Sequence, residues 1–260
     1  MPRLVLADGE LWYARHEGSA TAHPPLLLLH GAGGSHLDWP AALRRLSGPT
    51  RLIPDLAGHG RSTAPVRRSI AAHAADMFAL LDALALPVAV VVGHSMGGAV
   101  ALHMALEDSR RVAGLVLIAT GAHLPIAPDL WLASGGEGMA TALQARMWAE
   151  TAPAALRQRG LTRLAAVEPD VLRADLAACA QFDVRAALGR ITAPVLVIGG
   201  TADCIVPLAL SEALAKGLPN AELIAVAGGG HMLTLEQPEA VAGAILRWLR
   251  ARSLAPGRLF

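Results

Sequence analysis

Gly93-His94-Ser95-Met96-Gly97 is the most informative motif of this chain because of the two segments that flank it. The residues before it form a β-branched run bounded by Pro87 and Gly93, which predicts a buried strand over Val88–Val92. The residues after it are apolar at helical spacing and rich in helix formers, which predicts a helix over Met96–Glu107. A serine in Gly-x-Ser-x-Gly between a strand and a helix is typical of a strained turn that holds a nucleophilic hydroxyl above the sheet. The motif therefore makes Ser95 a candidate nucleophile.

Two partners for such a serine follow in the required order. Asp203 comes just after a predicted strand over Val195–Ile198, and His231 comes after the next one, over Glu222–Val226. A neutral imidazole can take the proton of a serine hydroxyl, and a carboxylate can fix the tautomer of that imidazole. We therefore predict His231 as the base and Asp203 as the acid. The alternatives are an N-cap role for Ser95, a loop or N-cap carboxylate at Asp203 and a surface loop histidine at His231.

The chain resembles an α/β-hydrolase from about Leu26 to about Arg250. Five motifs carry the resemblance, in the order of that family: His30-Gly31-Ala32-Gly33-Gly34, Asp55-Leu56-Ala57-Gly58-His59-Gly60-Arg61-Ser62, Gly93-His94-Ser95-Met96-Gly97-Gly98, Asp203-Cys204-Ile205-Val206-Pro207 and Gly230-His231-Met232. The resemblance implies an α/β-hydrolase fold, which is a mostly parallel central sheet with helices on both faces and a small helical cap.

The same resemblance implies roles for individual residues. Ser95, Asp203 and His231 match the positions of the nucleophile, the acid and the base. An oxyanion hole is implied at the backbone N–H groups of Met96 and Ala32, with Gly33 as the alternative to Ala32. The serine argues against haloalkane dehalogenases and epoxide hydrolases, which use a carboxylate at this position.

Strand and helix patterns alternate along most of the chain, which favours a single domain over residues 1–260. Besides the strands above, the patterns predict an N-terminal hairpin and further strands at Leu4–Leu6, Glu10–Arg15, Leu26–Leu29, Arg51–Ile53 and Val112–Ala119. Further helices are predicted at Ala41–Leu46, Ile70–Leu84, Pro207–Lys216 and Pro238–Arg250. The alternation fails between Gly121 and Gln181, where apolar residues are interrupted by Pro and Gly. We predict a cap over about 121–181, with the core formed by 1–120 and 182–260.

The composition excludes several classes of function. A net charge of +1 over 260 residues, with no basic stripe, argues against a nucleic-acid partner. The two cysteines, Cys179 and Cys204, lie in no metal-binding spacing, and we expect neither a metal nor a cofactor. No apolar run is long enough for a signal peptide or a membrane span. We therefore expect a soluble, cytoplasmic protein without a membrane partner, and its oligomeric state stays open.

A few large apolar side chains are candidates for the wall of a substrate pocket. They are Trp131, Met147, Trp148 and Phe182 in or beside the cap, and Val206 and Met232 beside the predicted acid and base. Packing in a core is an equal alternative for each cap residue. We expect structural roles for His59 and for Asp55, which would anchor the turn at Gly58–Ser62.

The predicted function is hydrolysis of small to medium carboxylic esters through an acyl-enzyme on Ser95. An enol-lactonase or C–C bond hydrolase of aromatic degradation is the alternative. Either would bind a substrate carboxylate, for which the candidates are Arg146, Arg157, Arg159, Arg163, Arg173 and Arg185. A non-catalytic ligand receptor on the same fold is a third possibility.

Overall fold

A computed structural model describes residues 2–19, 23–128, 130 and 136–252 of the chain. Its centre is an eight-stranded sheet with the strand order β1-β2-β4-β3-β5-β6-β7-β8. The strands are β1 (Arg3–Leu6), β2 (Gly9–His16), β3 (Leu26–Leu29), β4 (Arg51–Pro54), β5 (Ala89–His94), β6 (Val112–Ile118), β7 (Val195–Gly200) and β8 (Ala221–Val226). The β1–β2 and β2–β4 pairs are antiparallel, and the remaining pairs are parallel.

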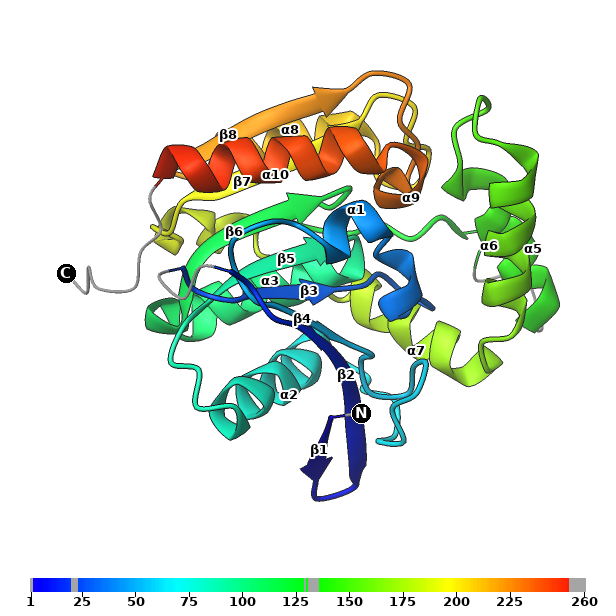
Figure 1. Ribbon diagram of the computed structural model, residues 1–260. Helices are drawn as coiled ribbons and strands as arrows, with labels where there is room; N and C mark the ends of the chain where they lie inside the picture. The colour runs from blue at the N-terminus through cyan, green and yellow to red at the C-terminus, as the bar shows by residue number, and fades with distance from the viewer. Residues whose placement is uncertain (1, 20–22, 129, 131–135, 253–260) are drawn as a thin grey trace.

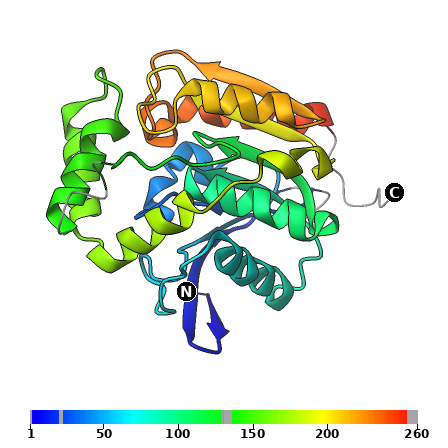
Figure 2. The same cartoon turned by 180° about the vertical axis from the view of Figure 1, so that it is seen from behind.

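Helices cover both faces of this sheet, as Figures 1 and 2 show from opposite sides. One face carries α1 (Ala41–Arg44) and α10 (Pro238–Arg252), with the short α9 (Leu233–Glu236) before α10. The other carries α2 (Ile70–Ala83), α3 (Met96–Glu107) and α8 (Leu208–Gly217). Three short 3-10 helices, η1 (His36–Asp38), η2 (Ser109–Arg111) and η3 (Arg185–Arg190), lie in connections. This arrangement is the predicted α/β-hydrolase fold.

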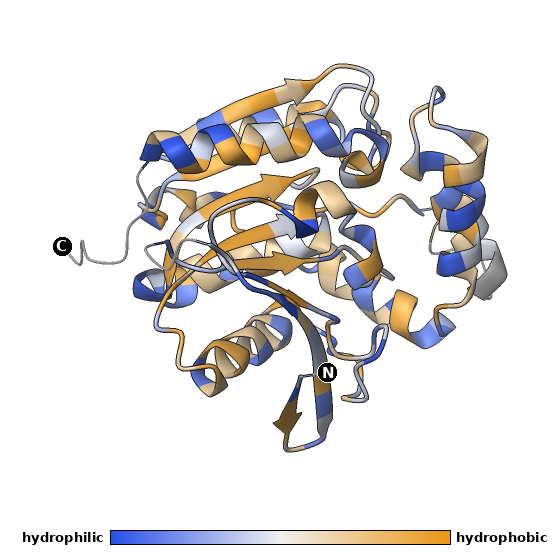
Figure 3. Ribbon diagram, viewed as in Figure 1, coloured by the Kyte–Doolittle hydropathy of each residue, from blue (hydrophilic) through white to orange (hydrophobic). Residues whose placement is uncertain are grey.

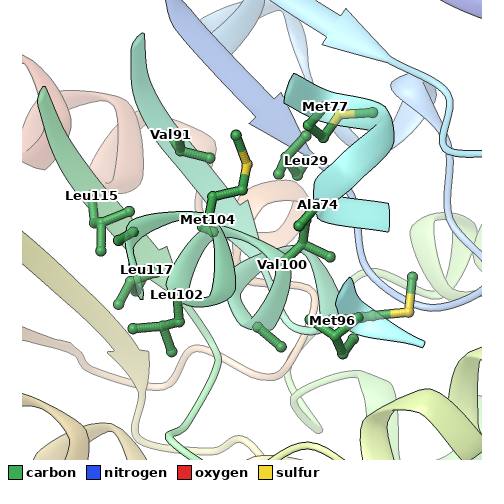
Figure 4. Close-up of a cluster of buried hydrophobic side chains, with 14 of the residues drawn as sticks. Leu29, Ala74, Met77, Val91, Met96, Val100, Leu102, Met104, Leu115 and Leu117 are labelled. Carbon is green, nitrogen blue, oxygen red and sulfur yellow. The ribbon is translucent and has the colours of Figure 1, made fainter. Parts of the chain in front are cut away.

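The two faces enclose two apolar clusters. On the α3 side, Val100 and Met104 of that helix pack with Val91 of β5 and Met77 of α2 (Figure 4). On the α10 side, Ile245 and Trp248 pack in the cluster that contains Val90 and Val92. Alternate residues of β5 therefore face opposite layers. The central strands β3, β5, β6 and β7 are strongly apolar (Figure 3). A central strand buried on both faces gives the turn at its end a rigid support.

The predicted elements differ from the observed ones mainly at their ends. β5 continues to His94, so the strand ends directly at Ser95. β6 stops at Ile118 because Ala119 has a φ of 48°, which lies outside the β region. Predictions missed α9 and the three 3-10 helices, whose three to six residues are too few to show a helical period.

Among the described residues between β6 and β7 are the α-helices α5 (Gly136–Met147), α6 (Ala154–Ala165) and α7 (Pro169–Ala180). They fall within residues 121–181, which we call the cap. Prolines that the sequence presents as breakers mark helix starts here, since Pro153 is the N-cap of α6 and Pro169 is at the first turn of α7. The cap has its own apolar cluster, which includes Leu143, Leu164 and Leu172. In the described residues, no helix has the length and apolar character needed to cross a membrane.

Candidate active site

Ser95 occupies the sharp turn between β5 and α3 with φ 52° and ψ −118°, a conformation that a non-glycine residue rarely adopts. Two glycines make the turn possible. A Cβ at Gly93 would lie 2.2 Å from the Gly97 carbonyl oxygen, and one at Gly97 would lie 2.1 Å from that of Leu29. The Ser95 side chain forms no cap hydrogen bond with α3, so its hydroxyl is available for another partner.

That partner is His231. The His231 Nε2 lies 3.0 Å from Ser95 Oγ, and its Nδ1 lies 2.9 Å from Asp203 Oδ2. The other carboxylate oxygen, Asp203 Oδ1, accepts the backbone N–H groups of Ile205 and Val206, both at 2.8 Å. The three predicted residues thus form one continuous chain of hydrogen bonds, although 136 positions separate Ser95 from His231.

The surroundings keep Asp203 ionised although it is buried. Burial alone would raise the pKa of this carboxyl, but His231 and the two backbone N–H donors outweigh it and lower the pKa below its ordinary value. A carboxylate in this state accepts from Nδ1–H, which leaves Nε2 free to take the serine proton. The geometry disfavours both a solvated loop carboxylate at Asp203 and a surface histidine at His231, since both residues are buried.

His94, inside the motif, supports the loop that carries the base. Its Nε2 lies 2.8 Å from the His231 carbonyl oxygen, which can only accept a hydrogen bond. Burial and the neighbouring His231 lower the pKa of His94 to about 4, so the ring is neutral near pH 7. His94 therefore donates from Nε2 and fixes the backbone at His231.

The two expected oxyanion donors have unpaired backbone N–H groups. Within the described residues, neither Ala32 nor Met96 donates a backbone hydrogen bond to another protein group. Met96 is the first residue of α3, where amide groups lack helical acceptors, and Ala32 lines the cavity that Ser95 faces. Gly33 is different, because its amide donates to Asp175 Oδ2 at 2.8 Å. Of the two alternatives, Ala32 is therefore the better candidate donor on that loop.

A cavity of about 340 Å³ lies between the cap and the ends of the strands, and both Ser95 and His231 line it. Four of the six predicted pocket residues are also in its wall: Met147, Trp148, Val206 and Met232. Phe182 is not among the lining residues. It follows α7 where the chain returns to the core, and it packs in the core cluster of α2 and α3. Trp131 lies outside the described residues.

Two carboxylates that the sequence analysis did not single out, one buried and one half-buried, connect the cap to this site. Asp175 on α7 contacts His59 and the Gly33 amide, both at 2.8 Å. Glu236 Oε2 accepts the amides of Ala149 and Gly230, both at 3.1 Å. Three of these four contacts join residues that are 87 to 142 positions apart, so no local pattern marks them. Asp55 behaves as expected, because its carboxylate accepts the Arg61 amide within the Gly58–Ser62 turn.

The structure also bears on metal and thiol chemistry. In the part of the chain that the structure describes, no three His, Cys, Asp or Glu side chains are grouped as ligands of a metal ion. Cys179 lines the cavity, but burial and the nearby Asp175 raise the pKa of its thiol well above the ordinary value. Ser95 is therefore the better candidate nucleophile in this cavity.

Comparisons with known proteins show the family to which this fold belongs. The sequence pattern of the alpha/beta hydrolase family matches residues 26–244. "Putative carbamate hydrolase RutD" of Caulobacter sp. (strain K31) is 32% identical, over 93% of this chain and 96% of that protein. A thermophilic esterase from Thermogutta terrifontis, solved with malate bound, has a TM-score of 0.86 at 27% identity, covering 96% of this chain and 99% of its own.

An enol-lactonase from Burkholderia xenovorans LB400 superposes with a TM-score of 0.87, covering 96% of this chain and all of its own at 23% identity. This last likeness concerns the fold alone. The residues that match the family pattern include Ser95, Asp203 and His231, and they contain most of the mostly parallel sheet. The chain belongs to the alpha/beta hydrolase family.

Proposed function

We propose that this protein is a serine hydrolase that cleaves small to medium carboxylic esters through an acyl-enzyme intermediate. The observation that carries the proposal is the hydrogen-bonded chain Ser95–His231–Asp203 at the wall of an apolar cavity. The esterase from Thermogutta terrifontis, at 27% identity, supports the same reaction class. A non-catalytic receptor would not need a strained serine aligned with a base and an acid.

The reaction follows from the positions of these groups. Ser95 Oγ attacks the acyl carbon while its proton passes to His231 Nε2, and the carbonyl oxygen becomes an oxyanion that the Ala32 and Met96 amides bind. Collapse of this intermediate breaks the bond to the alcohol, which leaves with the proton from His231. A water then gives a proton to His231 and attacks the acyl carbon. The bond from the acyl carbon to Ser95 Oγ breaks, His231 returns the proton to Oγ, and the acid is released.

The direct test combines turnover with covalent labelling. The protein should hydrolyse p-nitrophenyl acetate, and a fluorophosphonate should label Ser95 alone, as mapped by peptide mass spectrometry. The panel should include carbamates, because a relative at 32% identity carries a carbamate hydrolase name. Absence of both turnover and labelling would exclude the proposed reaction.

The size of the cavity predicts an optimum in acyl length. Each buried methylene contributes about 0.8 kcal/mol while it fits, so kcat/KM should rise from acetate to longer acyl groups. A cavity of about 340 Å³ is at the small end of ordinary ligand sites. We expect a maximum at roughly C4–C8 in a series of p-nitrophenyl esters from C2 to C16.

Two leucines one turn apart on α7 provide a matched pair for this series. Leu176 lines the cavity and Leu172 does not, although both are buried in the apolar cluster of the cap. Leu176→Ala should move the optimum to longer esters, whereas Leu172→Ala should lower stability without moving it. An optimum at C14 or C16 with activation at a lipid interface would indicate a true lipase instead.

A second candidate function, hydrolysis of an anionic substrate such as an enol-lactone acid or a ring-fission product, has one observation in its favour. Of the six candidate arginines, Arg159 and Arg163 on α6 line the cavity. Arg163 lies 3.7 Å from Asp38, whereas Arg159 has no hydrogen-bond or ion-pair partner within the described residues. A panel of enol-lactones and ring-fission diketones beside neutral esters separates the two candidates.

Asp38 should make the preference for anionic substrates depend on pH. Burial raises the pKa of this cavity-lining carboxyl to about 6, against the opposing effects of the Ser35 amide, Arg163 and His36, while Asp55 adds to the rise. Asp38 is therefore neutral below about pH 6 and negative above it. A like charge facing the substrate costs on the order of 1 kcal/mol, which is about fivefold in kcat/KM.

The measurement is the ratio of kcat/KM for p-nitrophenyl hemiglutarate to that for p-nitrophenyl butyrate between pH 5.5 and 8. Titration of the catalytic groups cancels in this ratio. It should fall as the pH rises through about 6, and Asp38→Asn, which keeps the acceptor for the Ser35 amide, should make it flat. A ratio that is already independent of pH in the unmodified protein would contradict this role of Asp38.

A further inference from the structure

Asp175 belongs to the cap, but its carboxylate binds the loop that carries the expected oxyanion donor. Its side chain is fully buried, and a single oxygen, Oδ2, lies 2.8 Å from the Gly33 amide and 2.8 Å from His59 Nε2. Gly33 directly follows Ala32. One buried atom of α7 thus joins the cap to the loop after β3 and to the turn at Gly58–Ser62.

The second partner of this oxygen, His59, faces an acceptor with each ring nitrogen, which favours a proton on both. His59 Nδ1 lies 3.0 Å from the Ala57 carbonyl oxygen, which can only accept, and Nε2 faces the Asp175 carboxylate. Burial opposes the charged ring, but Asp175 outweighs it and raises the pKa of His59. The neighbouring rings are neutral, because burial lowers the pKa of His30 to about 3 and that of His73 to about 4. Asp175 and His59 therefore form a buried ion pair.

The peptide groups on both sides of Ala32 are held by hydrogen bonds. Before it, the Gly31 carbonyl oxygen accepts the Gly34 amide at 3.0 Å and His30 Nδ1 at 2.8 Å. After it, the Gly33 amide donates to Asp175 Oδ2. Gly33 itself has a φ of +62°, so the backbone there follows a path that few side chains permit. Of the two anchors, Asp175 is the one that the cap supplies.

We propose that Asp175, paired with protonated His59, is a positioning residue that aims the Ala32 N–H at the oxyanion. The proposal rests on the proposed function, since it requires an oxyanion to form at Ser95. The cap then has a part in the chemistry as well as in enclosing the substrate. The Ala32 N–H belongs to the peptide group between Gly31 and Ala32, and Asp175 holds the next peptide group, between Ala32 and Gly33. Without this anchor the segment Ala32–Gly34 can shift, and the Gly34 amide then no longer holds the Gly31 carbonyl oxygen in place. The peptide group that carries the Ala32 donor can then tilt away from the alignment that the transition state needs.

The test compares three variants on one helix. Asp175→Ala removes the acceptor, Asp175→Asn keeps an oxygen of the same reach without the charge, and Asp170→Ala removes an exposed carboxylate that pairs with Arg173. The readouts are kcat and KM for an ester, and the affinity for a trifluoromethyl ketone that forms a tetrahedral adduct on Ser95. Thermal melting checks that each variant is folded. If Asp175→Ala does not fold, Asp175→Ser replaces it, because the serine side chain is too short to reach Gly33.

A positioning role predicts a specific pattern. Asp175→Ala should lower kcat about 10- to 100-fold, somewhat less than the loss of a whole oxyanion donor, with KM within about threefold. Affinity for the trifluoromethyl ketone should fall by the same factor as kcat/KM, because both report the tetrahedral state. Asp175→Asn should stay within about fivefold of the unmodified protein, and Asp170→Ala should match it.

Other outcomes overturn the proposal. A change in KM alone, with ketone affinity unchanged, would mean that Asp175 only holds the cap over the cavity. An equal loss in the alanine and asparagine variants would exclude the Gly33 hydrogen bond as the cause. If the unmodified protein forms no adduct with the ketone or a fluorophosphonate, the proposed function fails first. If it forms the adduct and Asp175→Ala binds the ketone equally well, the positioning role alone fails.

Discussion

Replacing Ser95 with alanine is expected to lower kcat for ester hydrolysis by about 10⁶-fold, because the hydroxyl oxygen is the atom that forms the bond to the acyl carbon. The oxyanion donors and the cavity remain, so a residual rate of ~10³-fold over water should persist. Fluorophosphonate labelling should disappear. The fold should be retained, since the Ser95 side chain has no structural partner apart from His231 among the described residues.

A matched serine controls for non-specific effects. Ser109→Ala changes an exposed serine in η2, and it should leave both kcat and labelling at Ser95 unchanged. Melting temperatures of both variants should lie close to that of the unmodified protein. Labelling that persists in Ser95→Ala and maps to another serine, such as Ser62 or Ser134, would show that the nucleophile has been misassigned.

The turn at Ser95 between β5 and α3 was predictable because it depends on local sequence. The β-branched run before Gly93 predicts a strand buried on both faces, and only a residue without a Cβ fits at Gly93 and Gly97 in the observed turn. Asp203 and His231 were predictable in the same way, because each follows a recognisable strand. Parallel strands bring their carboxyl ends to one edge of the sheet, so residues at these ends lie close together in space.

The cap was much less predictable. Two of its helices, α6 and α7, start at prolines that the sequence analysis took as interruptions. Its apolar residues do not indicate which face of the molecule they cover. The sequence analysis gave both Met147 and Phe182 as candidates for the pocket wall. In the structure, Met147 lines the cavity and Phe182 packs in the core. That difference depends on where the chain returns to the sheet after α7, which is a tertiary property.

Buried polar pairs between distant segments were not predictable either. Asp175 was one of several scattered acidic residues of the cap, and His59 had only an expected structural role in its turn. They meet across 116 positions, and burial of both makes their contact more consequential than an exposed pair. Local patterns identify the candidate reacting groups, whereas the residues that would orient these groups depend on packing between elements.

Asp203→Asn is expected to lower kcat by up to ~10⁴-fold while the protein remains folded. Asp203 Oδ1 accepts the amides of Ile205 and Val206, and Oδ2 faces His231 Nδ1. In asparagine, the single oxygen must stay with the two amides, so the NH₂ group points at Nδ1. Nδ1 then becomes an acceptor, the proton moves to Nε2, and the ring can no longer take the proton of Ser95.

The measurements for this variant are kcat, KM and the rate of fluorophosphonate labelling. The labelling rate should fall in parallel with kcat, because the same base activates Ser95 in both reactions, and KM should change little. Asp183→Asn, which alters an exposed carboxylate paired with Arg185, is the control and should behave like the unmodified protein. The hydrogen bonds at Asp203 make the prediction strict, since asparagine cannot satisfy both amides and keep His231 in the reactive tautomer. Near-normal activity of Asp203→Asn would therefore mean that another carboxylate orients His231 during turnover.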